Sequence, residues 1–92
     1  MAKKLSPSMQ DYLEAILDLS STDDEVRITD IANRLSLSKA STNQAIGGLV
    51  ERGMVTHRHY GPVALTESGR EEARKIRYRH DVLKSFLTNA LG

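Results

Sequence analysis

The sequence predicts a mainly α-helical fold with one small β-hairpin and a long C-terminal helix. Three observations lead to this prediction. Apolar residues recur at helical spacing in four separate stretches. A short polar break, Ser36–Ser38, divides two of these stretches. Between residues 54 and 66 the pattern changes to short apolar runs on either side of a Gly-Pro turn.

The first helix is expected to begin at Ser6-Pro7, with Ser6 as cap and Pro7 at the first helical position. It should run to about Ser20, with its acidic residues on the face opposite an apolar stripe. The stripe consists of Met9, Tyr12, Leu13, Ile16 and Leu17, and the acids are Asp11, Glu14 and Asp18. The alternation in Val26–Ile28 then predicts a short strand.

Residues 29–53 have the layout of a helix-turn-helix. We expect Thr29 to cap the first short helix and Ser38 the second, and Gly53 to end the second in the left-handed conformation. The core face of the second helix should comprise Thr42, Ala45, Ile46, Leu49 and Val50. Gly47 and Gly48 are expected on the outward face, either as a flat surface for close approach of another backbone or as a neutral feature.

A hairpin is expected directly after the second helix, which is the position of a wing. Val55 should begin one strand and Val63–Leu65 form the other, with the turn at Tyr60-Gly61-Pro62. Arg58 would lie at or near the tip, with His57 and His59 beside it. The alternative interpretation is an ordinary solvated hairpin without a binding role.

Thr66 is expected to cap the long C-terminal helix. One stripe of this helix is mainly apolar and another face is charged. The stripe contains Gly69, Ala73, Ile76, His80, Leu83 and Leu87, and the charged face contains Arg70, Arg74, Lys75 and Arg77. If the helix is continuous, its far end should project with Leu83, Phe86 and Leu87 exposed, where a partner helix, a second chain or a further domain would cover them.

Composition excludes several classes of protein. A length of 92 residues predicts one domain, and the absence of cysteine excludes disulfides, thiolate metal sites and Cys nucleophiles and fits a cytoplasmic protein. No apolar run approaches the ~20 residues of a membrane span. An aromatic content of 4% argues against single-strand binding by base stacking. The sequence contains no nucleophile–base motif and no phosphate-cradling glycine loop. It therefore predicts neither an enzyme nor a protein that binds a small-molecule substrate.

Charge is distributed unevenly along the chain. Residues 1–25 hold two Lys against six acids, whereas residues 26–61 hold five Lys or Arg against two acids. The helix-turn-helix and hairpin are therefore basic, as expected for contact with phosphates.

Three residues are candidate metal ligands. Asp11 and Glu14 lie three apart on one predicted helix, so their carboxylates can converge, and His80 interrupts the apolar stripe of another. Carboxylates and imidazole suit a divalent ion such as manganese or iron(II). Each residue also has an ordinary explanation: Asp11 as an acid favoured by the helix dipole, Glu14 as a solvated side chain and His80 as a core histidine.

The chain resembles the N-terminal part of the metal-dependent repressors of the diphtheria-toxin-repressor family, and most of all its manganese transport regulators. The resemblance covers nearly the whole chain, and the order and spacing of its motifs make it specific. These motifs are SPSMQDYLEAI at Ser6–Ile16, ITDIANRL at Ile28–Leu35, the Ser38–Gly53 helix, GPVALTESG at Gly61–Gly69 and YRHDVL at Tyr78–Leu83.

This resemblance implies a winged helix-turn-helix DNA-binding domain in residues 1–70, and in residues 71–92 a long helix that begins a dimerisation and metal-binding region otherwise absent here. It implies a homodimeric, metal-dependent transcriptional repressor of metal-homeostasis genes that binds a double-stranded operator with no membrane association. The expected ion is Mn²⁺, with Fe²⁺ as the alternative, bound by Asp11, Glu14 and His80. The residues expected at DNA are Ser38, Lys39, Ala40, Ser41, Asn43, Gln44 and Arg58.

One departure from the family pattern is the Gly47-Gly48 pair, where relatives usually carry larger, often basic residues. The alternative function is a metal-independent winged-helix module that binds DNA or protein.

Overall fold

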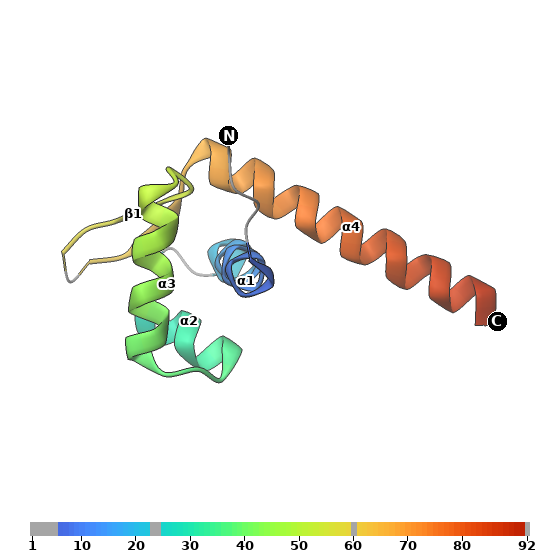
Figure 1. The fold of residues 1–92 in the computed structure, drawn as a ribbon, viewed down its shortest axis with the longest axis horizontal. Coiled ribbons are helices and arrows are strands. Elements are labelled where there is room, and N and C mark those ends of the chain that lie inside the picture. The colour runs from blue at the N-terminus through green and yellow to red at the C-terminus, as the bar shows by residue number, and fades with distance from the viewer. Residues whose placement is uncertain (1–5, 23–24, 60, 92) are drawn as a thin grey trace.

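The helices and the antiparallel hairpin follow one another along the chain in the order the sequence predicts, apart from one expected strand before the second helix (Figure 1). The computed structural model describes residues 6–22, 25–59 and 61–91, and it describes side-chain environments up to Ser85, apart from Pro7. The elements are α1 (Pro7–Thr22), α2 (Ile28–Leu35), α3 (Lys39–Glu51), β1 (Val55–His57), β2 (Val63–Leu65) and α4 (Glu67–Leu91). Within these described ranges, no helix is both long and apolar enough to cross a membrane.

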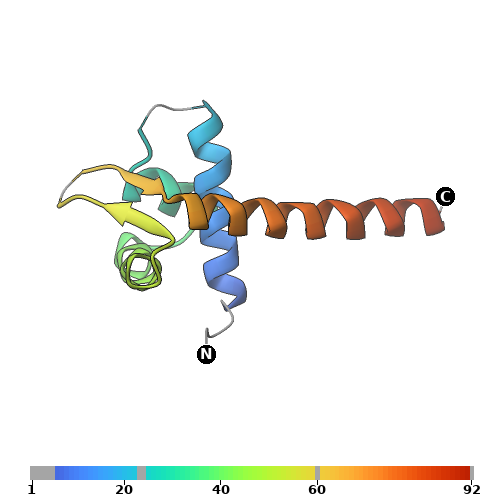
Figure 2. The same cartoon turned by 90° about the horizontal axis from the view of Figure 1, so that it is seen from above.

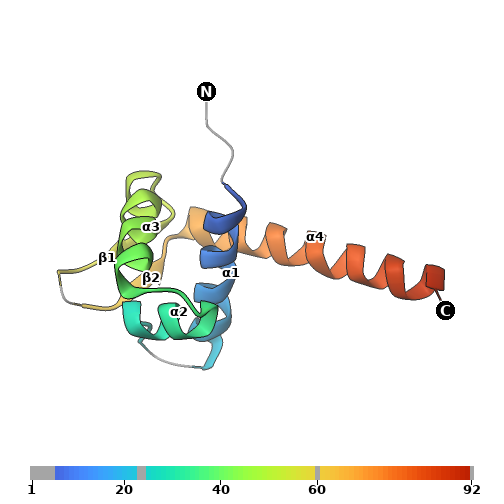
Figure 3. The ribbon, with the colours of Figure 1, turned by 60° about the horizontal axis from the view of Figure 1, so that its bottom comes forward.

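The helix α1 occupies the centre of the fold and packs against α2, α3, β2 and α4 (Figure 3). Ser6 caps it as expected, since the Ser6 Oγ accepts a hydrogen bond from the Met9 N–H at 3.2 Å. Leu13 and Ile16 of its apolar face are completely buried. With Tyr12 of the same helix, they form the core together with residues from every other element and from the segment before α2: Val26, Ile31, Ile46, Leu49, Val55, Val63, Ala73 and Ile76.

The beginning of α2 differs from the expectation. The helix starts at Ile28, so Thr29 lies inside it and Arg27 is the N-cap residue with extended backbone. The reason is a local hydrogen bond in which the Asp30 carboxylate accepts from the Arg27 N–H at 2.9 Å. The predicted strand at Val26–Ile28 was also wrong, because only Val26 pairs with the hairpin, through an isolated bridge to Val63.

The turn between α2 and α3 follows from local backbone chemistry. Ser36 adopts the left-handed conformation, with φ of 56°, and the Leu37 N–H reaches back to the Ala32 carbonyl at 2.9 Å. Ser38 caps α3 as predicted, since its Oγ accepts from the Ser41 N–H at 3.1 Å. The buried hydroxyl of Thr42 is satisfied by the Ser38 carbonyl at 2.9 Å.

The two faces of α3 are only partly as predicted. Thr42, Ile46 and Leu49 are buried, but Val50 is 41% exposed. Gly47 faces open space as expected, whereas the expectation for Gly48 was wrong, because a Cβ there would lie 2.7 Å from the Met9 Cε of α1. The approach of α1 to the middle of α3 therefore turns Gly48 into a packing position.

In the hairpin, Val55 pairs with Leu65, Thr56 with Ala64 and His57 with Val63. The Gly61 N–H donates to the Arg58 carbonyl at 2.8 Å, so the hydrogen bond that closes the turn begins at Arg58, before the expected Tyr60–Pro62. Tyr60, which the turn prediction included, lies outside the described residues. Arg58 is exposed at this turn, as expected for a wing tip.

The beginning of α4 is held close to the end of α3. Gly53 has the predicted positive φ, 72°. The Thr66 hydroxyl donates to the Gly53 carbonyl at 2.6 Å and accepts from the Gly69 N–H at 3.0 Å, which confirms Thr66 as the cap of α4. A Cβ added at Gly69 would collide with the Met54 carbonyl oxygen, so only glycine permits this approach.

Beyond Ile76, α4 extends away from the rest of the fold (Figure 2). Ala73 and Ile76 are buried, whereas Leu83 is 58% exposed as predicted and Val82 is 48% exposed. The side chains of Phe86 and Leu87 lie outside the described part of the chain. The helix is continuous across residue 70, where the sequence placed the boundary between two regions.

We predict opposite effects of alanine at two helical glycines. Gly69→Ala should lower the free energy of unfolding by roughly 1–3 kcal/mol or more, because the methyl group has no room beside Met54. Gly47→Ala should raise it by about 0.5–1 kcal/mol, because its site is open and alanine favours the helix. Urea denaturation of both variants checks this, and a Gly69→Ala midpoint equal to that of the wild type would contradict the assigned close contact.

Candidate nucleic-acid interface

The first two-thirds of α3 presents a row of exposed small and polar residues. Its members are Lys39, Ala40, Ser41, Asn43, Gln44 and Gly47, and Ser38 just before the helix is exposed as well. The buried side of the same helix holds Thr42, Ile46 and Leu49, so packing fixes which face points outward. A helix with this face fits the major groove, which is about 12 Å wide and carries a distinct hydrogen-bonding pattern for each base pair.

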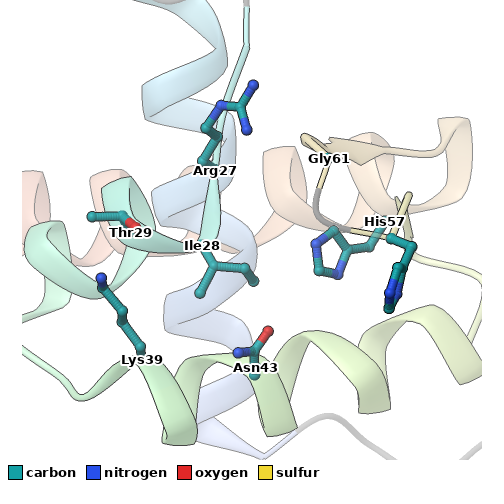
Figure 4. Close-up of a pocket in the computed structure, with 8 residues that line it drawn as sticks. Arg27, Ile28, Thr29, Lys39, Asn43, His57 and Gly61 are labelled. Atoms are coloured by element: carbon teal, nitrogen blue, oxygen red, sulfur yellow. The ribbon is translucent and has the colours of Figure 1, made fainter.

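A pocket of about 570 Å³ lies between the start of α2, α3 and the hairpin (Figure 4). In the close-up, Lys39 and Asn43 rise from α3 toward Ile28 and Thr29 at the start of α2. The described residues that line it are Arg27, Ile28, Thr29, Lys39, Asn43, His57, His59 and Gly61. Two permanent cations, hydroxyl and amide groups and two imidazoles, with no acidic residue among them, make this pocket suitable for a phosphate group.

The pocket brings together residues that the sequence treated separately. Of the expected DNA contacts, Lys39 and Asn43 line it, whereas Ser38, Ala40, Ser41 and Gln44 lie along α3 and Arg58 lies at the hairpin turn. Arg27 and Thr29 were not identified from the sequence as lining a site. The sequence predicted a later start for α2, with Thr29 as its cap. The excess of basic residues in 26–61 was the available signal for Arg27.

Arg27 also contacts an acid next to the pocket. Its Nη2 lies 3.3 Å from the Glu25 Oε2, and both side chains are more than half exposed. An exposed ion pair of this kind contributes little to stability and is screened by salt. Arg27 can therefore exchange Glu25 for a phosphate at small cost.

The three expected metal ligands are not assembled in this arrangement. His80 Nδ1 lies 3.2 Å from the Glu14 Oε1, but Asp11 is exposed. In the described ranges, no group of three or more His, Asp or Glu side chains is placed to hold a metal ion. The other carboxylate oxygen of Glu14, Oε2, accepts from the Arg77 Nε at 2.9 Å.

Arg77 is therefore not on the solvated charged face where the sequence placed it. It is half-buried and pairs with both Glu14 and Asp18 of α1. Hydrogen bonds to Asp18 and Glu14 raise the pKa of the guanidinium further above its usual value. In this arrangement the guanidinium lies on one of the two Glu14 oxygens that an ion would have to bind, and the metal site stays a prediction.

A helix-turn-helix with an exposed polar face on its second helix, a cationic pocket beside it and a hairpin after it defines a winged helix-turn-helix DNA-binding protein. The sequence matches the family described as "Iron dependent repressor, N-terminal DNA binding domain" over residues 4–63. The chain belongs to this family, which consists of transcriptional regulators and not enzymes.

Two curated relatives are similar over most of the chain. The HTH-type transcriptional regulator MntR of Geobacillus kaustophilus is 33% identical over 82 residues, covering 89% of this chain and 58% of the relative. An uncharacterized HTH-type transcriptional regulator of Methanocaldococcus jannaschii is 34% identical over 89 residues, covering 96% of this chain and 71% of the relative. The chain thus spans a little over half the length of the MntR relative.

Solved structures share the fold. MepR, a transcription regulator of Staphylococcus aureus, superposes with a TM-score of 0.81 at 15% identity, covering 97% of this chain and 67% of MepR. IdeR of T. acidophilum superposes with a TM-score of 0.66 at 26% identity, covering 78% of this chain and 33% of IdeR. The first comparison supports the winged helix-turn-helix fold alone.

We predict that Lys39→Ala weakens binding to duplexes of any sequence and lowers the salt slope of log K by about 1, because one phosphate contact is lost. Lys75→Ala is the matched control, since Lys75 is exposed on α4 away from the pocket lining. Fluorescence anisotropy at several salt concentrations measures both. An unchanged slope in Lys39→Ala would exclude the pocket as a phosphate site.

Proposed function

We propose that this protein is a sequence-specific transcriptional repressor that binds operator DNA as a homodimer, with α3 as the base-reading helix. The observation that carries this proposal is the exposed polar row of α3 directly beside the cationic pocket. The polar row of α3 would contact base edges, while a backbone phosphate would occupy the cationic pocket. Base contacts specify the sequence, and phosphate contacts set the position of the protein on the duplex.

The roles of individual side chains follow from their chemistry. Gln44 is exposed about one turn into α3, and its amide can pair bidentately with adenine in the major groove. Lys39 and Arg27, from the two sides of the pocket, would hold one phosphate. Arg58 at the turn between β1 and β2 would reach a further phosphate along the duplex. The open surface at Gly47 admits close approach of the DNA backbone.

The homodimer would form through α4. This helix leaves the rest of the fold with Tyr78 70% exposed, followed by exposed Val82 and Leu83. A second copy that covers these side chains would place two α3 helices on one duplex. Dimeric helix-turn-helix proteins read half-sites about 34 Å apart, so such a pair matches a palindromic operator.

Regulation of this DNA binding by Mn²⁺ or Fe²⁺ is a separate and more specific hypothesis. The name of the matched family refers to iron, and Glu14 lies beside His80. Arg77 bonds to one carboxylate oxygen of Glu14, and the proposed DNA contacts are made by other residues.

Titration of duplex DNA at two salt concentrations tests the proposal. Binding should weaken steeply with salt and should prefer certain sequences selected from a random pool. Salt-insensitive or undetectable binding would instead indicate a winged-helix module that contacts protein.

We predict that Gln44→Ala relaxes sequence preference by roughly 1–3 kcal/mol at one base pair, because a bidentate contact is lost. Binding to non-specific duplexes should change little. Asn33→Ala, which removes an exposed amide from α2 outside the proposed DNA contacts, provides the comparison. Competition between operator and non-operator duplexes measures the ratio, and equal loss on both would show that Gln44 does not read a base.

We predict that Val82→Gln with Leu83→Gln prevents self-association, because the two exposed apolar side chains are the described part of the proposed dimer surface. The control is Leu37→Gln, since Leu37 is 48% exposed but lies in the turn before α3. Sedimentation at high micromolar concentration distinguishes the variants. A wild-type chain that sediments as a monomer there would refute dimerisation through this helix.

A further inference from the structure

The last buried side chain of α4 in the described residues is Ile76, which is 1% exposed. Residues 78–85 are all exposed, so apolar packing ends at Ile76. Arg77 follows directly and is half-buried. Its contacts are therefore placed to determine the direction in which α4 leaves the rest of the fold.

Arg77 joins α4 to two carboxylates of α1. Its Nε donates to the Glu14 Oε2 at 2.9 Å, and its Nη2 donates to the Asp18 Oδ1. The exposed fractions of the Arg77, Glu14 and Asp18 side chains are 37%, 20% and 27%. Since Glu14 and Asp18 lie one helical turn apart, a planar guanidinium can bridge them, which a single ammonium group cannot do with the same geometry.

The same carboxylates connect to further elements. The second oxygen of Asp18 accepts from the Arg34 Nη2 of α2 at 3.1 Å, and Glu14 lies beside His80 of α4. A continuous set of charged contacts thus runs from α4 through α1 to the first helix of the helix-turn-helix. It connects the exposed end of α4 with the part of the fold that positions α3.

We infer that Arg77 supplies from within the chain the positive charge that fixes α4 on α1, so that the orientation of α4 relative to the helix-turn-helix is set without a divalent metal ion. A metal ion at Glu14 would have to displace the guanidinium or lie beside it, and like charges at that distance repel. An arginine side chain carries its positive charge over the whole physiological pH range. The positive charge of Arg77 is therefore always present beside α1, whereas a bound metal would depend on its concentration.

Thermal unfolding monitored by circular dichroism tests this inference with the intact chain. Wild type, Arg77→Leu and Arg77→Lys are each melted in EDTA and in excess Mn²⁺. Arg74→Leu is the matched control, because Arg74 is an exposed arginine one turn earlier on α4. Arg77→Lys keeps the positive charge but loses the planar guanidinium that bridges the two carboxylates. It provides a second test if Arg77→Leu does not fold.

The expected result is an equal melting temperature of the wild type in EDTA and in Mn²⁺. Arg77→Leu should melt roughly 5 °C or more below Arg74→Leu, with Arg77→Lys above Arg77→Leu. A rise of the wild-type melting temperature in Mn²⁺ would overturn the inference, as would equal melting of Arg77→Leu and Arg74→Leu. The relevance of the Arg77 contact to DNA recognition rests on the proposed function, but the contact itself does not. Because the melting experiment contains no DNA, it tests the contact independently of DNA binding.

Discussion

The burial of one face of α1 is the constraint on which the rest of the structure depends. Leu13 and Ile16 are completely inaccessible, and they are covered by α2, α3, β2 and α4 together. Burying such a side chain contributes about 1.5–3 kcal/mol, so α2, α3, β2 and α4 are each stabilised by contact with this shared partner. The two helices of the helix-turn-helix and the base of the hairpin consequently have one relative arrangement, which is what a DNA-reading surface needs.

A second property of α1 is that its charged edge is shared by helices on either side of it. Glu14 and Asp18 meet Arg77 of α4, and Asp18 also meets Arg34 of α2. The hairpin and the end of α4 lie at opposite ends of the molecule, whose longest dimension is 48 Å (Figures 1 and 2). The charged contacts of α1 connect α4 with α2, in addition to the apolar core and to the direct hydrogen bond between Thr66 and Gly53.

Features that depend on a few neighbouring residues could be predicted from the sequence. The caps Ser38 and Thr66 and the left-handed Gly53 were predicted correctly, because each is determined by a side chain or backbone angle within one turn. The start of α2 was missed because both Thr29 and Arg27 were possible N-cap residues. The hydrogen bond from the Arg27 N–H to Asp30 selects Arg27. The polar row of α3 was predicted for the same reason as the caps: helical periodicity assigns it to the side opposite Ile46 and Leu49.

By itself, the sequence determined the order of the elements, the turn between α2 and α3 and the outward face of α3, since these follow from periodicity and local hydrogen bonding. The tertiary structure alone decided that Gly48 faces Met9 and that Gly69 lies against Met54, because both depend on how closely two elements approach. It also decided that Arg27 and Lys39 share a pocket and that Arg77 turns toward α1. Periodicity gives the angle of a side chain around its own helix, but only the packed neighbour determines which charge or surface that side chain meets.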